Sequence, residues 1–129
     1  MSQKILIVDD EPEFSELVEY RLANCGYTFC TATNSTDALN QAWDSPPDLI
    51  LLDLLLPDLD GLSVCEIFAR HPATHRIPII MITAVGSDVT RFSAKVAGAR
   101  QFFAKPVDFE VLKQAMAQLL APAPMNSGV

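Results

Sequence analysis

The sequence predicts an α/β fold, a single (βα)5 domain in which five short parallel strands alternate with five helices. Two observations lead to this prediction. Short apolar runs alternate with amphipathic stretches along the chain, and the first, third and fourth runs are almost continuously aliphatic. Strands covered by helices on both faces have that composition. The 129 residues, of which 50% are hydrophobic and 19% charged, are typical of one globular domain.

The expected strands are short runs rich in aliphatic and β-branched residues, each followed by polar residues or by a turn. None is long enough to cross a bilayer, so no membrane insertion is expected. The five segments are Lys4–Val8, Thr28–Ala32, Leu49–Leu52, Ile79–Ile82 and Gln101–Ala104.

The first two expected helices follow from apolar spacing and from capping residues. The first helix stops at Gly26, because glycine readily takes the left-handed conformation that ends many helices. The second follows the cap candidates Asn34 and Ser35 and runs to about Asp44. The first carries its apolar residues at i, i+3 and i+4 spacing: Phe14, Leu17, Val18, Leu22 and Cys25.

The other three expected helices lie in the second half of the chain. One covers Leu62–His71 and ends before a proline, and the next runs from about Asp88 to Gly98. That fourth helix places Val89, Phe92 and Val96 on one side. The last helix starts at Asp108 and buries residues at helical spacing: Phe109, Leu112, Ala115, Met116 and Leu119.

Composition limits the classes of function. The net charge of −7 disfavours nucleic acid as a direct ligand. The three cysteines lack a C-x-x-C spacing, which argues against zinc or disulfides, and the N-terminus lacks a signal-peptide pattern, so a cytoplasmic location is expected. Charge is uneven, because residues 1–69 contain 13 acids and 2 bases, whereas residues 70–129 contain 3 acids and 7 bases.

We expect residues 1–121 to form the domain. Residues 122–129 are rich in Ala and Pro and lack apolar periodicity, so they are expected to be a flexible tail or the truncated end of a linker.

Acidic residues follow two of the expected strands. Asp9 and Asp10 come directly after Lys4–Val8, and Asp53 comes directly after Leu49–Leu52. Ligands of open parallel sheets bind at the carboxyl ends of the strands, where these three carboxylates are expected to converge. Because carboxylates that lie close together repel one another, they need protons or a cation. Mg²⁺, which takes a few carboxylates with water and phosphate, fits this set.

The remaining strand ends add groups suited to a phosphoryl anion. The fourth strand ends in Thr83, which offers a hydroxyl, and the fifth is followed by Lys105, which offers a cation. A metal, a lysine and a hydroxyl at one edge of the sheet supply the charge neutralisation and positioning that phosphoryl transfer requires.

With these motifs in order, the sequence resembles the receiver domain of two-component response regulators over roughly residues 4–120. The motifs that carry the resemblance are Ile7-Val8-Asp9-Asp10-Glu11, Leu51-Leu52-Asp53, Pro57 with Asp60-Gly61, Thr83-Ala84, Ala97-Gly98-Ala99 and Lys105-Pro106. The resemblance implies a flavodoxin-like, doubly wound sheet with strand order 2-1-3-4-5 and helices on both faces.

The resemblance also implies a role for each site residue. Asp53 would be the phosphoacceptor, and Lys105, preceding a cis peptide bond to Pro106, would pair with phosphoryl oxygens. Thr83 would hydrogen-bond one of those oxygens, and Phe102 would be the switch aromatic. The implied metal ligands, one of them through water, are Asp9, Asp10, Asp53 and the backbone carbonyl of Leu55.

By the same resemblance the chain is a switch that catalyses its own phosphorylation and dephosphorylation, not an enzyme that turns over an external substrate. The phosphodonor would be a sensor histidine kinase or a histidine phosphotransfer protein. An output domain or a second copy would dock on the face of the fourth helix, fifth strand and last helix, which carries basic residues: Arg91, Lys95, Arg100 and Lys113.

Three alternatives compete with this interpretation. A phosphohydrolase of the haloacid dehalogenase type would need a second acid two places after Asp53, where Leu55 stands. A flavodoxin-type flavin binder would need Ser and Thr after the first strand, where acids stand instead. A degenerate receiver that is not phosphorylated would lack part of the polar set, all of which is present: Asp9, Asp10, Asp53, Thr83 and Lys105.

Overall fold

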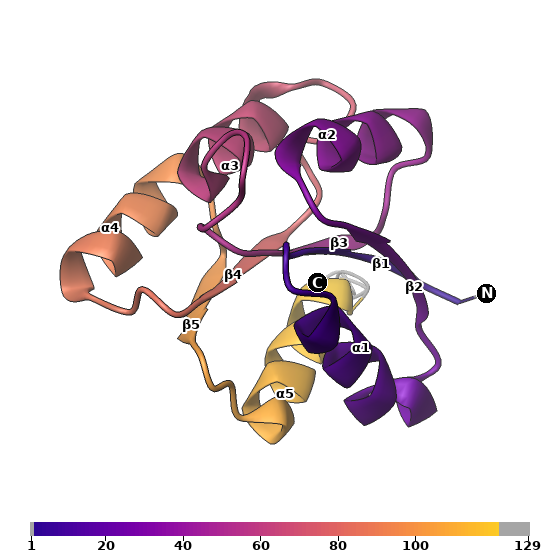
Figure 1. Ribbon diagram of the computed structural model, residues 1–129. Helices are drawn as coiled ribbons and strands as arrows, with labels where there is room; N and C mark the ends of the chain where they lie inside the picture. Colours follow the sequence, from indigo (N-terminus) through magenta and orange to yellow (C-terminus); the bar gives the residue numbers. More distant parts are fainter. Residues whose placement is uncertain (1, 122–129) are drawn as a thin grey trace, which may run out of the picture.

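The computed structural model describes residues 2–121, so the expected tail at residues 122–129 lies outside the described part. Within the described residues, five strands alternate with five α-helices (Figure 1). The strands are β1 (Lys4–Val8), β2 (Thr28–Ala32), β3 (Leu49–Leu52), β4 (Ile79–Thr83) and β5 (Gln101–Ala104). The helices are α1 (Pro12–Arg21), α2 (Ser35–Asp44), α3 (Gly61–Arg70), α4 (Asp88–Ala97) and α5 (Phe109–Leu120).

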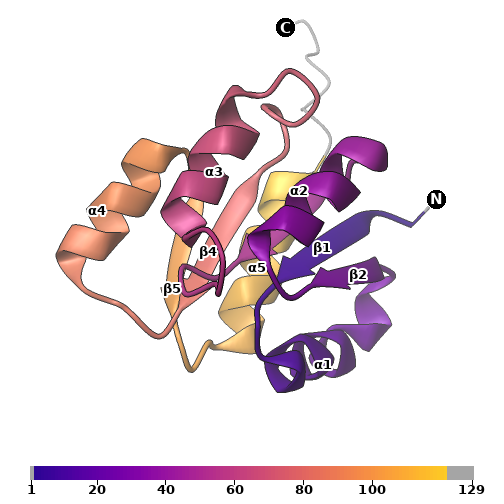
Figure 2. The ribbon, with the colours of Figure 1, turned by 45° about the horizontal axis from the view of Figure 1, so that its top comes forward.

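All five strands are parallel and lie in the order β2-β1-β3-β4-β5, which confirms the predicted topology. Helices α2, α3 and α4 cover one face of the sheet, and α1 and α5 cover the other (Figures 1 and 2). The strand order reverses between β1 and β3, so the carboxyl ends of these two strands form the switch point at which such sheets bind ligands.

Each face of the sheet contributes to its own apolar core. Phe68 of α3 and Met81 of β4 are fully buried on the side of α2, α3 and α4. Leu112 and Met116 of α5 are fully buried with Ile80 on the side of α1 and α5. Strands β1, β3 and β4 therefore bury side chains on both faces, which explains their continuous aliphatic sequences.

The first helix ends earlier than the sequence predicts. Helix α1 stops at Arg21, and Ala23–Cys25 form a separate 3-10 turn before Gly26, whose φ of 84° requires glycine or a strained residue. Of the apolar residues expected on the buried side, Val18 and Leu22 are fully buried, but Leu17 is 44% exposed.

The fourth helix contains a larger departure from a simple amphipathic pattern. Val89, Phe92 and Val96 share one side of α4, as the spacing predicts, but they are 76%, 68% and 71% exposed. The helix instead packs through Ala94 and Ala97, which are small enough to bring α4 close to the sheet. Periodicity identified the side that these residues share but could not show that this side faces outward.

The described residues 2–121 include no helix with both the length and the apolarity needed to cross a bilayer.

We predict that two chemically identical truncations on either side of the α1 boundary differ in cost. Leu22→Ala should lower the free energy of unfolding by about 2–5 kcal/mol, because Leu22 is fully buried and its loss leaves a cavity. Leu17→Ala should cost less than about 1 kcal/mol, because this side chain is already 44% exposed and its loss removes less buried surface. Urea unfolding of both variants measures the difference, and equal losses would contradict the structure.

Candidate functional site

Strands β1 and β3 place two aspartates side by side. Asp9 directly follows β1 and Asp53 directly follows β3, and Val8 pairs with Leu52 in the register of these two neighbouring strands. The backbone N–H of Asp53 donates to the carbonyl of Val8 at 3.0 Å, which extends the pairing into the site. Both carboxylates are buried, with Asp9 2% exposed and Asp53 4% exposed.

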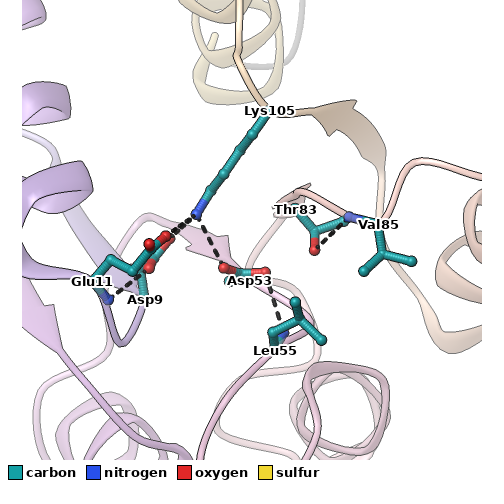
Figure 3. A network of polar contacts seen from close by, with 7 residues as sticks. All are labelled: Asp9, Glu11, Asp53, Leu55, Thr83, Val85 and Lys105. Atoms are coloured by element: carbon teal, nitrogen blue, oxygen red, sulfur yellow. Dashed lines mark hydrogen bonds and ion pairs between the residues drawn. The ribbon is translucent and has the colours of Figure 1, made fainter.

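The ammonium of Lys105 lies between these carboxylates (Figure 3). Its Nζ donates to Asp9 Oδ2 at 2.8 Å and to Asp53 Oδ2 at 3.1 Å, and it lies 3.2 Å from Oε1 of Glu11. The ring of Phe14 lies on another side of the ammonium, with its centroid 4.3 Å from Nζ. Lys105 follows β5, at the edge of the sheet, so its side chain connects the end of β5 to the ends of β1 and β3.

Burial and pairing act in opposite directions on these groups. Burial raises the pKa of Asp9, and the hydrogen bond from Lys105 lowers it only in part, so its pKa lies above the usual range. Burial by itself would lower the pKa of Lys105, but its hydrogen bonds to Asp9 and Asp53 outweigh that effect and raise it. The lysine is therefore a firmly charged cation in contact with two carboxylates.

The acids form a cluster that fits a hard cation. One carboxylate oxygen from each of Asp9, Asp10 and Asp53 lies within 4.8 Å of the others, and Asp10 is exposed. Leu55 belongs to the same rim, because its backbone N–H donates to Asp53 Oδ1 at 3.2 Å. Carboxylates with water and phosphate are the ligands that Mg²⁺ prefers, so this donor set fits the metal that the sequence predicts.

Thr83 ends β4 and is fully buried. Its Oγ1 accepts a hydrogen bond from the backbone N–H of Val85 at 3.4 Å, and its carbonyl accepts one from the N–H of Lys105 at 2.8 Å. Figure 3 shows Asp53 between Lys105 and Thr83. The structure thus brings Asp9, Asp10, Asp53, Thr83 and Lys105 to one edge of the sheet, and the Lys105–Pro106 peptide bond is cis, as expected.

Phe102 lies outside this cluster, on β5 beneath α4, and is 7% exposed. Arg91 of α4 contacts it twice, since Nη1 donates to the Phe102 carbonyl at 3.2 Å and the guanidinium carbon lies 4.8 Å from the ring centroid. A groove of about 580 Å³ between α4 and β5 is lined by both residues and by Lys95 and Arg100. Lys113, on α5, pairs instead with Glu110 at 3.1 Å.

Sequence reasoning missed the part that two residues play in the site. The carboxylate of Glu11 contacts the Lys105 ammonium in addition to those of Asp9 and Asp53. The one sequence feature that indicated this was its place directly after Asp9 and Asp10. Gly61 begins α3 against the loop that follows β3, where an added Cβ would lie 2.2 Å from the carbonyl oxygen of Asp53. Only glycine allows this close approach. The Asp60-Gly61 motif of the sequence pointed to this position, but the steric reason is visible only in the structure.

The fold and this site define a class: flavodoxin-like α/β proteins with an acidic pocket and a lysine at the carboxyl edge of the sheet. The family model described as "Response regulator receiver domain" matches residues 5–117, and the chain belongs to this family. It is 37% identical over 117 residues to the DNA-binding dual master transcriptional regulator RpaA of Synechocystis sp., covering 91% of this chain and 48% of RpaA.

Solved structures of response regulators are similar to this chain in fold and in sequence. The receiver domain of NtrX from Brucella abortus is 34% identical with a TM-score of 0.81, and the match covers 92% of this chain and 99% of that one. The phosphorylated cyanobacterial phytochrome response regulator RcpA is 26% identical with a TM-score of 0.83, covering 95% and 97%. The chain spans about half the length of RpaA.

We predict that Asp9→Asn stabilises the metal-free protein at pH 7. The raised pKa of Asp9 means that the folded protein holds this proton at pH values where the unfolded chain has lost it. Stability contributed by Asp9 therefore falls as pH rises from the unfolded value of 3.8 through the raised folded value. Asparagine does not titrate, so the advantage of Asp9→Asn should grow as pH rises above 3.8 and through the raised folded value. Urea unfolding in EDTA measures it, and an advantage that shrinks with pH would contradict the assignment.

Proposed function

We propose that Asp53 accepts a phosphoryl group and that this chain is a phosphorylation-controlled switch. The observation that carries the proposal is the buried Asp53 carboxylate, held 3.1 Å from the Lys105 ammonium inside a cluster of three acids. Response regulators receive signals from histidine kinases, so the donor would be the phosphohistidine of a sensor histidine kinase or of a histidine phosphotransfer protein.

In the proposed reaction a carboxylate oxygen of Asp53 attacks phosphorus while the bond from phosphorus to the leaving group breaks. The electron pair of that bond leaves with the imidazole nitrogen of the donor, or with acetate when acetyl phosphate is the donor. Lys105 would move its hydrogen bond from Asp53 Oδ2 to a phosphoryl oxygen, and the Thr83 hydroxyl would donate a hydrogen bond to another phosphoryl oxygen. These contacts neutralise and orient the transferred group without covalent help.

The proposed metal ligands are Asp10, Asp53 and the carbonyl of Leu55, with Asp9 acting through a water. Bound Mg²⁺ would shield the carboxylates from one another and from the incoming phosphoryl oxygens. Hydrolysis of the acyl phosphate would return Asp53 to its resting state. Both steps would change the chain's own Asp53, which makes the chain a switch and not an enzyme dedicated to an external substrate.

Phosphorylation would then change the α4-β5-α5 face. The phosphoryl group would carry roughly −1.5 to −2 charges where the free carboxylate carried about −1, and Thr83 and Lys105 are the donors positioned to respond. Movement of Thr83 would open space beside β4 for Phe102, whose contacts with Arg91 connect it to the basic groove. An output domain or a second copy of the chain would dock there.

We also propose that residues 1–121 are the receiver unit. RpaA, a transcriptional regulator, extends well beyond the matched region, because the match covers 48% of it.

The acceptor assignment predicts a single covalent change. With Mg²⁺ and acetyl phosphate, intact-protein mass spectrometry should show the gain of one phosphoryl group, and Asp53→Asn should show none. Asp10→Asn should need more Mg²⁺ for the same gain, because it removes a proposed metal ligand. A gain that persists in Asp53→Asn, or in excess chelator, would refute the assignment.

The switch assignment predicts where the signal goes. Adding Mg²⁺ and beryllofluoride should shift NMR resonances of Thr83 and Phe102 and of the α4-β5-α5 face. Partner binding to that face should tighten on phosphorylation and weaken with salt, because Arg91, Lys95 and Arg100 lie in its groove. Shifts confined to the pocket, or spread over α2 and α3 instead, would contradict this assignment.

A further inference from the structure

The first turn of α2 has an unusual set of acceptors for its backbone N–H groups. The first four N–H groups of any helix lack partners within the helix. Here the N–H of Asp37 donates to the side chain of Asn34 at 2.8 Å, and that of Ala38 donates to the Asn34 carbonyl at 3.1 Å. Asn34 is thus an ordinary N-cap, as the sequence predicts, but the N–H groups of Ser35 and Thr36 need other acceptors.

These two groups donate to a residue outside the helix. Asp58, in the loop between β3 and α3, accepts from the N–H of Ser35 at 2.8 Å and from the N–H of Thr36 at 3.0 Å. The hydroxyl of Thr36 donates to the same carboxylate at 3.0 Å. The hydroxyl of Ser35, a buried residue, donates to the carbonyl of Leu59. We name these contacts of Asp58 and Leu59 with Ser35 and Thr36 the α2 clasp.

The carboxylate of Asp58 stays ionised in the clasp, although Asp58 is at the surface. The backbone hydrogen bond from Ser35, followed by that from Thr36, holds the pKa of Asp58 far below its usual range. A carboxylate at a helix N-terminus also lies at the positive end of the helix dipole. The side chain therefore remains an anion with three donors at neutral and at mildly acidic pH.

The clasp fixes one end of the loop that carries Leu55. The other end is fixed at the site itself, where the N–H of Leu55 donates to Asp53 and the N–H of Gly61 donates to the carbonyl of Leu54 at 2.8 Å. Leu55 lies between these anchors with its side chain 55% exposed, so apolar burial of that side chain does little to hold its backbone. Leu54 is buried and Leu56 packs against the core, so the backbone at Leu55 is held by these neighbours together with the hydrogen-bond anchors.

We infer that Asp58 is a positioning residue for the proposed metal site. By holding the β3–α3 loop against the first turn of α2, it keeps the Leu55 carbonyl where a cation bound by Asp10 and Asp53 can use it. Asp58 itself does not touch the cation. The inference rests on the proposed function, because it assigns a role toward the Mg²⁺ that Asp53 and its neighbours would hold.

The test separates metal affinity from reaction rate. Phosphorylation by acetyl phosphate is followed by mass spectrometry over a range of Mg²⁺ concentrations in the wild type and in Asp58→Ala. Mg²⁺ binding without a phosphodonor is followed separately by the rise in melting temperature with Mg²⁺ concentration, which should need about tenfold more Mg²⁺ in Asp58→Ala. The Mg²⁺ concentration at half-maximal rate should rise about tenfold in Asp58→Ala, as at the lower end of outer-shell substitutions. The rate at saturating Mg²⁺ should remain close to that of the wild type, since no group that touches the phosphoryl is removed.

Matched variants exclude charge and helix stability as causes. Asp48→Ala removes the same charge and another carboxylate that accepts a backbone N–H, that of Lys4 at 2.7 Å, but at the opposite end of β3. It should leave the Mg²⁺ requirement unchanged. Thr36→Val removes only the hydroxyl bond of the clasp and should raise the requirement less than Asp58→Ala does. Asp58→Asn keeps one acceptor oxygen and should give an intermediate value.

The outcomes are distinct. An unchanged Mg²⁺ requirement in folded Asp58→Ala, even with a lower melting temperature, would overturn the inference and leave Asp58 as a helix cap alone. Equal changes in Asp58→Ala and Asp48→Ala would overturn it as well. If Asp58→Ala does not fold, the Mg²⁺ requirement of Thr36→Val decides the question. A wild-type protein that gains no phosphoryl group at any Mg²⁺ concentration would overturn the proposed function, and the rise in melting temperature with Mg²⁺ would then decide this inference separately.

Discussion

The structure depends on the neutralisation of two buried carboxylates by one lysine. Asp9 and Asp53 end neighbouring strands and are almost completely removed from water, which would be costly for two like charges. Lys105 meets both at hydrogen-bond distance, so the cluster carries a cation of its own. In the proposed reaction, a phosphoryl group arriving at Asp53 would meet a charge that is already in place, which is the kind of preorganisation that favours phosphoryl transfer.

The same contact connects distant parts of the chain. Lys105 follows the edge strand β5, and 96 positions separate it from Asp9 at the end of β1. The segment that carries Lys105 also carries Phe102, whose ring and carbonyl are held by Arg91 of α4. In the proposed switch, a change in charge at Asp53 would act on β5, because Lys105 contacts Asp53 and directly follows the strand that carries Phe102.

Backbone anchors on the other side of the pocket are equally direct. Gly61 lets α3 begin against the carbonyl of Asp53, and Asp58 ties the intervening loop to the first turn of α2. The rim is thus held on one side by ion pairs with Lys105 and on the other by hydrogen bonds to helix termini. A small shift in the ion pairs with Lys105, or in the hydrogen bonds of the β3–α3 loop, would change the position of Asp53, because that loop is short.

The sequence by itself determined the fold class, all five strands and the residues that meet at the sheet edge. Aliphatic runs report burial on both faces, and polar residues directly after them must lie at one edge of a parallel sheet. Only the tertiary structure decided which groups pair, because the contacts of Lys105 and Asp58 join segments far apart in the chain. It also decided that Leu17 and Phe92 face outward, since apolar spacing defines a side of a helix but not what covers it.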